Sequence, residues 1–216
     1  SDVCSSDLSA AGPTFEAIDP VRGITNRSSG KMGFAIARAA REVGAQVTLI
    51  AGPVHQSTPQ GVVRLDVQSA IDMQQAVQQQ LEQADVFIAT AAVADWRVTQ
   101  VAEHKIKKDD SGQLPSLSFT ENPDILAGAA ATERARSGQL YCVGFAAESH
   151  DLEAHAKAKR LKKKVPLLVG NIGPDTFGRD DNALLLVDAQ GTHALPRADK
   201  LTLARQLMAE IARRLN

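Results

Sequence analysis

Short apolar or β-branched runs alternate along this chain with segments whose apolar residues recur at the spacing of one helix face. This alternation is typical of a parallel or mostly parallel sheet that is covered by helices. We therefore predict a Rossmann-like three-layer α/β sandwich. The expected strands span residues 46–51, 62–67, 85–91, 116–120, 140–146, 167–170 and 183–187, and the expected helices follow residue 33 and span 68–83, 122–134, 151–163 and 199–215.

The length and the charge balance narrow the class of protein. A chain of 216 residues can bury one well-formed core, so we expect residues 1–216 to form a single domain. Its 24 Lys and Arg residues against 25 Asp and Glu give a formal charge of -1, so no overall field draws it to nucleic acid or to an anionic membrane. Any anion site must therefore be local.

Cysteine usage and hydropathy indicate the compartment. The two cysteines, Cys4 and Cys142, fit neither a disulfide framework nor a paired metal motif, so we expect a reducing, cytoplasmic setting. No apolar run approaches the ~20 residues needed to span a bilayer, and the first residues lack the basic and apolar regions of a secretory signal. We expect neither export nor a membrane anchor.

Two stretches depart from the alternation. Residues 93–114 are polar and carry several lysines, which predicts either a mobile flap or an excursion over a binding site. Residues 1–8, Ser-Asp-Val-Cys-Ser-Ser-Asp-Leu, precede the point at which a doubly wound fold should have completed a buried first strand. They are too polar for that role, so we expect an atypical N-terminal segment.

The loop that leads into the first predicted helix is a candidate anion site. Its members are small or polar: Ser28, Ser29 and Gly30, with Asn26, Arg27, Lys31 and Gly33 around them. Small residues at a helix mouth allow backbone N–H groups and the positive end of the helix dipole to face an anion, usually a phosphate. A serine N-cap would explain the same small residues, although the polar and basic neighbours favour the anion site. Neither a Walker loop nor a Gly-x-Gly-x-x-Gly fingerprint is present.

The predicted strand 85–91 ends in Ala89, Thr90 and Ala91, and Asp95 follows. In open α/β sheets, ligands bind beyond the carboxyl ends of the strands, and small residues there leave room for a base or a sugar. Asp95 is therefore a candidate site residue. The alternative is that it only caps a turn.

Lysines gather in two separate groups. Lys105 belongs to a Lys-Ile-Lys-Lys run, and Lys159 and Lys163 share one face of a predicted helix because they are four residues apart. A charge run is usually a solvated face. Like charges on one face repel unless an anion lies between them, however, so the two groups favour a polyanionic small molecule such as a nucleoside triphosphate. RNA is disfavoured because the six Phe, one Trp and one Tyr are not clustered.

Other chemistry-bearing residues give weaker signals. Asn122 followed by Pro123 predicts a helix start, which is a sufficient structural reason for both. The five histidines show no metal-ligand spacing, and no Ser/His/Asp or Cys/His pairing stands out.

Six motifs, taken together and in order, resemble those of the phosphopantothenate-cysteine ligases, also called phosphopantothenoylcysteine synthetases. They are Asp19 to Arg22, Asn26 to Gly33, Ala91 to Asp95, Lys105 to Lys108, Asn122 to Ile125 and Gly144 to Glu148. The sequence is most similar to the bacterial CTP-using type. That resemblance implies ligation of 4′-phosphopantothenate to L-cysteine in coenzyme A biosynthesis, through an acyl-cytidylate, with CTP as co-substrate and Mg²⁺ as the divalent cation.

The resemblance also implies roles for individual residues. Asn26 would engage the acyl-cytidylate carbonyl, and Lys105 would assist the first step. Nucleotide contacts are implied for Ala89, Thr90, Ala91, Asp95, Lys105, Pro123, Asp124, Ile125, Leu126, Phe145, Lys159 and Lys163. Ser28, Ser29 and Gly30 remain candidates for the substrate phosphate from the loop composition alone. A homodimer is implied, as is a flavin-dependent decarboxylase half that is usually fused upstream and that we do not recognise in this sequence.

Two other functions are alternatives to the ligase. A Rossmann-type oxidoreductase predicts a glycine fingerprint and an acidic ribose ligand, and neither is evident. A non-catalytic nucleotide-binding module would need neither Asn26 nor Lys105.

Overall fold

The computed structural model describes residues 5–107, 116–148, 150–172 and 179–215. Its main sheet has eight strands in the order β12-β11-β10-β9-β6-β1-β4-β5. The strands from β10 to β5 run parallel, and β11 and β12 complete one edge in antiparallel pairing. The bounds are β1 Ser6–Ala11, β4 Gln46–Ala51, β5 Val63–Asp66, β6 Val86–Ala89, β9 Tyr141–Glu148, β10 Leu167–Ile172, β11 Asp181–Val187 and β12 Thr192–Asp199.

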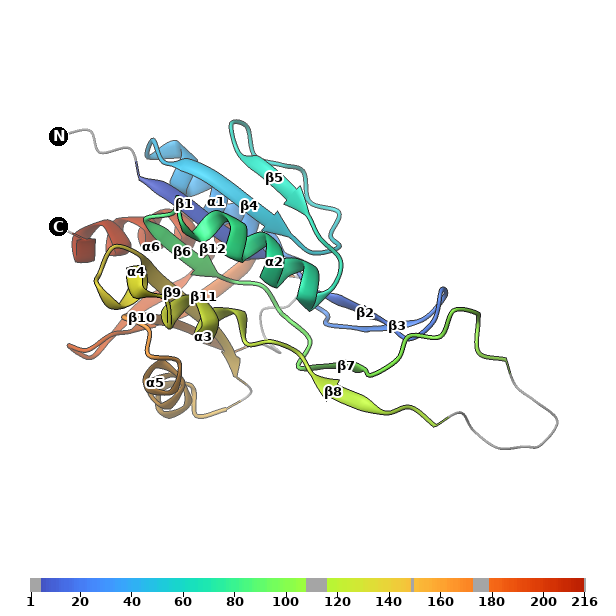
Figure 1. Ribbon diagram of the computed structural model, residues 1–216. Helices are drawn as coiled ribbons and strands as arrows, with labels where there is room; N and C mark the ends of the chain where they lie inside the picture. The colour runs from blue at the N-terminus through green and yellow to red at the C-terminus, as the bar shows by residue number, and fades with distance from the viewer. Residues whose placement is uncertain (1–4, 108–115, 149, 173–178, 216) are drawn as a thin grey trace.

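Helices cover both faces of this sheet (Figure 1), so the predicted three-layer sandwich is confirmed. On one face α1 and α6 pack together, and their apolar residues, among them Ile36 and Leu207, form one core cluster with the sheet. The other face carries α2, α3, α4 and α5, and its cluster includes Met73 and Phe87. The helix bounds are α1 Lys31–Glu42, α2 Ala70–Leu81, α3 Ile125–Ala130, α4 Glu133–Arg136, α5 Leu152–Lys163 and α6 Lys200–Leu215.

Local sequence signals explain several of these boundaries. Helix α2 begins after Ser69, whose side chain accepts from the Asp72 N–H at 3.1 Å while Asp72 accepts from the Ser69 N–H at 2.9 Å, which is a capping box. The prediction of one continuous helix over 122–134 is wrong. A second N-cap, Thr132, separates α3 from α4, and its hydroxyl accepts from the Ala135 N–H at 3.2 Å.

The expectation that the N-terminal segment cannot supply a buried strand is also wrong for its described part. Strand β1 lies between β4 and β6 and pairs with both. Leu8 and Ala10 face one core cluster, whereas Asp7 and Ser9 point to the other face and are only 3% and 1% exposed. Pairing at both edges thus places two polar side chains in the interior. The remaining residues, 1–4, lie outside the described part of the chain.

Two ribbons project side by side from one end of the sheet (Figure 1). One consists of β2 (Phe15–Ala17) and β3 (Gly23–Thr25), and the other of β7 (Trp96–Val98) and β8 (Phe119–Glu121). The strand predicted at 116–120 therefore belongs to a ribbon instead of the main sheet. The described part of the predicted flap, 93–107, includes β7, and residues 108–114 of that flap lie outside the described residues.

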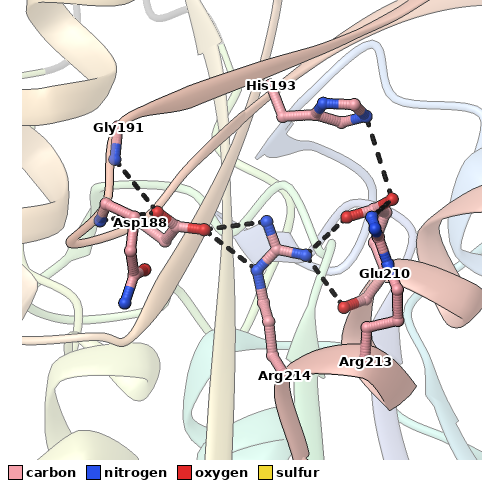
Figure 2. Close-up of polar contacts among 7 residues, drawn as sticks. Asp188, Gly191, His193, Glu210, Arg213 and Arg214 are labelled. Atoms are coloured by element: carbon pink, nitrogen blue, oxygen red, sulfur yellow. Dashed lines mark hydrogen bonds and ion pairs between the residues drawn. The ribbon is translucent and has the colours of Figure 1, made fainter.

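A network of hydrogen bonds and ion pairs joins α6 to the hairpin of β11 and β12 (Figure 2). Arg214 donates to Asp188 Oδ2 through Nε at 3.0 Å and Nη2 at 2.7 Å, and to Glu210 Oε2 through Nη1 at 2.6 Å. The predicted closing helix at 199–215 is confirmed in this position. Among the described helices, none has the length and apolar content needed to cross a membrane.

Candidate active site

The strand order reverses direction between β1 and β6, and this is where a cleft opens. From β1 the chain moves outward to β4 and β5, then returns to β6 on the other side of β1. At such a switch point the loops leaving the carboxyl ends of neighbouring strands diverge, which leaves a crevice for ligands. A cleft of about 710 Å³ lies here, and residues of the α1 mouth, the β6 exit, α3 and α5 line it.

The mouth of α1 forms one wall of the cleft. Gly30 is the N-cap, with a left-handed backbone of φ 73° that glycine adopts readily, and no side chain caps it. The serine N-cap considered from the sequence is therefore not formed. Ser28, Ser29 and Gly30 all line the cleft at the positive end of the helix dipole.

Asn26 stands at the entrance to this mouth. It is exposed to the cleft, and its Oδ1 accepts from the Ser28 N–H at 3.1 Å. That bond fixes the orientation of the side-chain amide. Its Nδ2 donates to none of the described residues, so it remains available as a donor to a ligand oxygen.

A close approach brings the α1 mouth to the strand ends. A Cβ at Gly33 would stand 2.4 Å from both Ala11 Cβ and Thr90 Oγ1, so only glycine allows this packing. Thr90 Oγ1 in turn donates to the Ala10 carbonyl at 2.7 Å. The predicted small residues after β6, Ala89 to Ala91, thus line the cleft next to the helix mouth.

Asp95 lies further along the same loop and lines the cleft with an exposed side chain. Its carboxylate accepts no hydrogen bond from the described residues, so it does not serve there as a turn cap. The main chain around it is fixed instead by Asn122, whose Nδ2 donates to the Ala94 carbonyl at 2.8 Å and whose N–H donates to the Asp95 carbonyl at 2.8 Å.

The start of α3 and the adjacent face of α5 form the opposite wall, which holds the predicted Pro123 to Leu126, Phe145, Lys159 and Lys163. Asp124 caps α3 by accepting from the Ala127 N–H at 3.0 Å and forms an ion pair with Lys163. Burial acts to raise the pKa of Asp124, but the hydrogen bonds from Lys163 and the Ala127 N–H and the charges of Lys163 and Lys162 together outweigh it, so the pKa lies below its usual value.

The two α5 lysines do share a face of the cleft, but each also has a carboxylate partner. Lys159 Nζ lies 3.8 Å from Glu148 Oε1, and Lys163 pairs with Asp124. The repulsion inferred from the spacing alone is therefore offset within the protein. Lys162, which the sequence did not single out, lines the cleft beside them.

Lys105 is not among the cleft-lining residues. It is exposed on the segment that follows β7, next to Ile106, whose main chain is bound by Asp19 and Arg22. Of the residues predicted to contact the nucleotide, it alone is not brought to the cleft by the described part of the chain.

Lys31, which the sequence placed at the candidate anion site, lines the cleft, and so do three polar residues from the chain after α5 that the sequence did not propose: Asn171, Asn182 and Lys200. Lys31 Nζ pairs with Asp180 Oδ1 at 2.6 Å. Burial lowers the pKa of Lys200, and the positive charge of Lys31 lowers it further. A polar residue inside an otherwise apolar strand, such as Asn182 in β11, is the signal that could have indicated this end of the cleft.

Within the described residues, no group of three or more His, Cys, Asp or Glu side chains could hold a metal ion by itself. The carboxylates that line the cleft are Asp95, Glu121 and Asp124. This set suits Mg²⁺ bound in the manner of phosphoryl-transfer sites, where one or two carboxylates and the substrate phosphates share the ion.

A family profile and the sequences of known proteins relate this chain to the same group of proteins. The family profile described as the DNA/pantothenate metabolism flavoprotein C-terminal domain matches residues 7–215. The coenzyme A biosynthesis bifunctional protein CoaBC of Vibrio cholerae serotype O1 is 48% identical over 204 residues, which are 93% of this chain and 50% of that protein. The Escherichia coli K12 protein of the same name is 46% identical over 208 residues, 94% of this chain and 50% of its own length.

A solved structure extends the relationship to the fold. The crystal structure of the C-terminal domain of a CoaBC protein superposes with a TM-score of 0.81 at 34% identity, covering 98% of this chain and 95% of that one. The chain spans about half the length of the curated relatives that it matches.

Proposed function

The chain belongs to the family of the DNA/pantothenate metabolism flavoprotein C-terminal domain, and on this premise we propose that it is a CTP-dependent phosphopantothenate-cysteine ligase of coenzyme A biosynthesis. The observation that carries the proposal is one cleft with groups that attract anions on each of two walls. Asn26 and the uncapped mouth of α1 lie on one wall, and the lysines of α5 lie on the other. Two anionic substrates need such separate sites, since their mutual repulsion must be offset locally.

The proposed first step forms the acyl-cytidylate. A carboxylate oxygen of 4′-phosphopantothenate attacks the α-phosphorus of CTP, the bond to the β-phosphate oxygen breaks, and pyrophosphate leaves. Pro123 to Leu126, Phe145, Lys159 and Lys163 are the proposed nucleotide contacts, together with Ala89 to Ala91 and Asp95. Ser28, Ser29 and Gly30 are the proposed contacts of the substrate phosphate, and Lys105 is proposed to assist this step.

The proposed second step forms the amide. The amine of L-cysteine attacks the acyl carbon, the amine loses a proton, and CMP leaves. The Nδ2 of Asn26 supports a role here, because its orientation is already set by the Oδ1 bond to the Ser28 N–H. A donor that is preoriented stabilises the oxyanion of the tetrahedral intermediate without reorganisation.

We propose Mg²⁺ as the divalent cation, with Asp95 as its protein contact because that carboxylate lines the cleft without a described partner. The ion would supply charge neutralisation for the triphosphate. A cytoplasmic location is proposed from the free, buried Cys142, which is typical of a reducing compartment.

We further propose a homodimer and a flavin-dependent decarboxylase half elsewhere in the full protein. The decarboxylase proposal is supported by the bifunctional relatives, of which this chain matches half. The dimer proposal is supported by the ribbon of β7 and β8, which exposes Trp96 and Phe119 as a T-shaped pair with ring centroids 6.3 Å apart.

A product assay tests the proposed function. CMP and pyrophosphate are measured with 4′-phosphopantothenate and L-cysteine, with either CTP or ATP. The proposal expects cysteine-dependent release with CTP and much weaker release with ATP. Absence of cysteine-dependent turnover with both nucleotides would contradict it.

A further inference from the structure

Asp19 has an unusually complete set of hydrogen bonds for a residue outside the cleft. Its side chain is fully buried, and Oδ1 accepts from the N–H groups of Val21 and Arg22, each at 2.8 Å. Oδ2 accepts from Arg22 Nε at 3.0 Å and Nη2 at 2.6 Å, and from the Ile106 N–H at 3.1 Å. One carboxylate therefore joins the loop between β2 and β3 to a segment 87 residues away.

The same pair of residues holds Ile106 from both sides. Asp19 accepts a hydrogen bond from the Ile106 N–H, and Arg22 Nη2 donates one to the Ile106 carbonyl at 2.6 Å. A second tie lies four residues earlier, where the Ala102 N–H donates to the Ile18 carbonyl at 3.0 Å. Lys105 lies between these two ties, directly before Ile106. Its own side chain is exposed and has no described partner, so the main chain alone determines where it projects from.

We propose that Asp19 is a positioning residue for Lys105, because it fixes the main chain at Ile106 from which the Lys105 side chain extends. The inference rests on the proposed function, in which Lys105 assists formation of the acyl-cytidylate. Lysine has a long flexible stem, so a fixed starting point reduces the conformations that it must give up to reach the reacting phosphate. Asp19 itself lines no part of the cleft.

Asp19→Ala is a sharp test because it removes both acceptor oxygens. An amide at this position could keep one oxygen toward the Ile106 N–H, whereas alanine leaves no acceptor for any of these N–H groups. Asp188 offers a matched control (Figure 2). Its Oδ1 accepts from the N–H groups of Gln190 and Gly191 at 2.8 and 3.1 Å, and its Oδ2 accepts from Nε and Nη2 of Arg214, but it binds no segment that carries a site residue.

The experiment measures two quantities in the wild type, in Asp19→Ala and in Asp188→Ala. The first is the single-turnover rate of acyl-cytidylate formation without cysteine, together with the Kd for CTP. The second is amide hydrogen exchange at Ile106 by NMR, with the Ala102 amide as an internal reference. We expect Asp19→Ala to lose protection at Ile106 but not at Ala102, and to slow the first step about 10- to 100-fold, with the Kd for CTP changed by less than about twofold.

Each other outcome decides against the inference or against its premise. Unchanged exchange at Ile106 in Asp19→Ala overturns the anchoring, whatever the activity. Lost protection with an unchanged first step, or an equal slowing in Asp188→Ala, overturns the link to Lys105 and leaves only a general stability effect. A wild type that forms no acyl-cytidylate contradicts the proposed function instead, and the exchange at Ile106 then decides the anchoring by itself.

Discussion

Asn26 is the residue whose replacement separates the two proposed chemical steps. Its Oδ1 is occupied by the Ser28 N–H, and its Nδ2 is the donor left for an acyl oxygen. We predict that Asn26→Ala accumulates acyl-cytidylate and forms amide about 100-fold more slowly or worse, as is typical when an oxyanion donor is removed. Quenched-flow separation of the intermediate and the product checks this. Amide formation at the wild-type rate would remove Asn26 from the mechanism.

Asp7, a buried carboxyl group in the core, makes the stability of the folded protein depend on pH. Burial raises its pKa from 3.8 to about 6, with a smaller contribution from the charge of Asp85. The folded state holds the Asp7 proton more tightly than the unfolded chain does. The free-energy cost of burying an ionised carboxylate here is therefore absent below about pH 4, where Asp7 is protonated in both states. Stability is lost as the pH rises from about 4 through about 6.

We therefore predict that Asp7→Val stabilises the protein at pH 7, by roughly 1–3 kcal/mol more than it does at pH 4. Urea unfolding of both proteins at the two pH values gives the comparison. The measured quantity is the difference in the free energy of unfolding between variant and wild type. Carboxylates with lowered pKa values, such as Glu42 beside Arg205, contribute equally to both proteins, so their pH-dependent effect on stability cancels. A difference that does not change with pH would show that Asp7 is not desolvated in the folded state.

At this scale, the sequence could identify residues whose neighbours along the chain carry the signal. The loop around Ser28 and the small residues before Asp95 were found in this way, and the structure brings them to one cleft. Asn182 and Lys200 were missed because they reach the cleft only through the fold of β11 and α6. The structural task of Asp19 was hidden for the same reason, since its partner Ile106 is distant in sequence.

At the scale of elements, the contact between α1 and the sheet depends on Gly33. A Cβ there would stand 2.4 Å from Ala11 Cβ and from Thr90 Oγ1, so α1 would have to move away from β1. We predict that Gly33→Ala lowers the free energy of unfolding by about 1–3 kcal/mol, as overpacked sites do, and weakens CTP binding by widening the cleft mouth. Denaturant unfolding and nucleotide titration measure the two effects.

Gly128 provides the control in another helix. A Cβ there meets no atom within 4 Å, so Gly128→Ala should stabilise α3 by roughly 0.5–1 kcal/mol through the lower entropy of the unfolded chain. If both alanine variants behave alike, the close approach of α1 to the strands does not set the stability of this region.

The elements themselves differed in how far periodicity could predict them. Strand β4 and helix α2 have patterns that match their burial, and they were predicted. Strand β1 was not, because pairing with β4 and β6 outweighs the polarity of Asp7 and Ser9. Strand β12 was missed as well: it lies at the sheet edge, is mostly exposed and contains Pro196, all of which remove the strand signal from its sequence.

At the scale of the whole molecule, the ribbon of β7 and β8 is the proposed dimer contact. Trp96 and Phe119 are 56% and 50% exposed, an apolar pair that a monomer would leave in water. We predict that Trp96→Ser combined with Phe119→Ser weakens the dimer at least about tenfold by sedimentation, since buried aromatic residues dominate interface energies. Leu161→Ser, which changes an exposed leucine on α5, should leave the association unchanged. A wild type that sediments as a monomer at micromolar concentration contradicts this prediction.

The central claim is that one cleft activates a carboxylate with CTP and then transfers the acyl group to cysteine. The most direct measurement is a chase. Protein is first mixed with CTP, Mg²⁺ and labelled 4′-phosphopantothenate in the absence of cysteine. L-cysteine is then added, after the first turnover, together with excess unlabelled 4′-phosphopantothenate. The account predicts that labelled acyl-cytidylate forms in an amount close to that of the protein and passes into amide product when cysteine is added. Amide that forms without this intermediate, or an intermediate that cysteine does not consume, would contradict it.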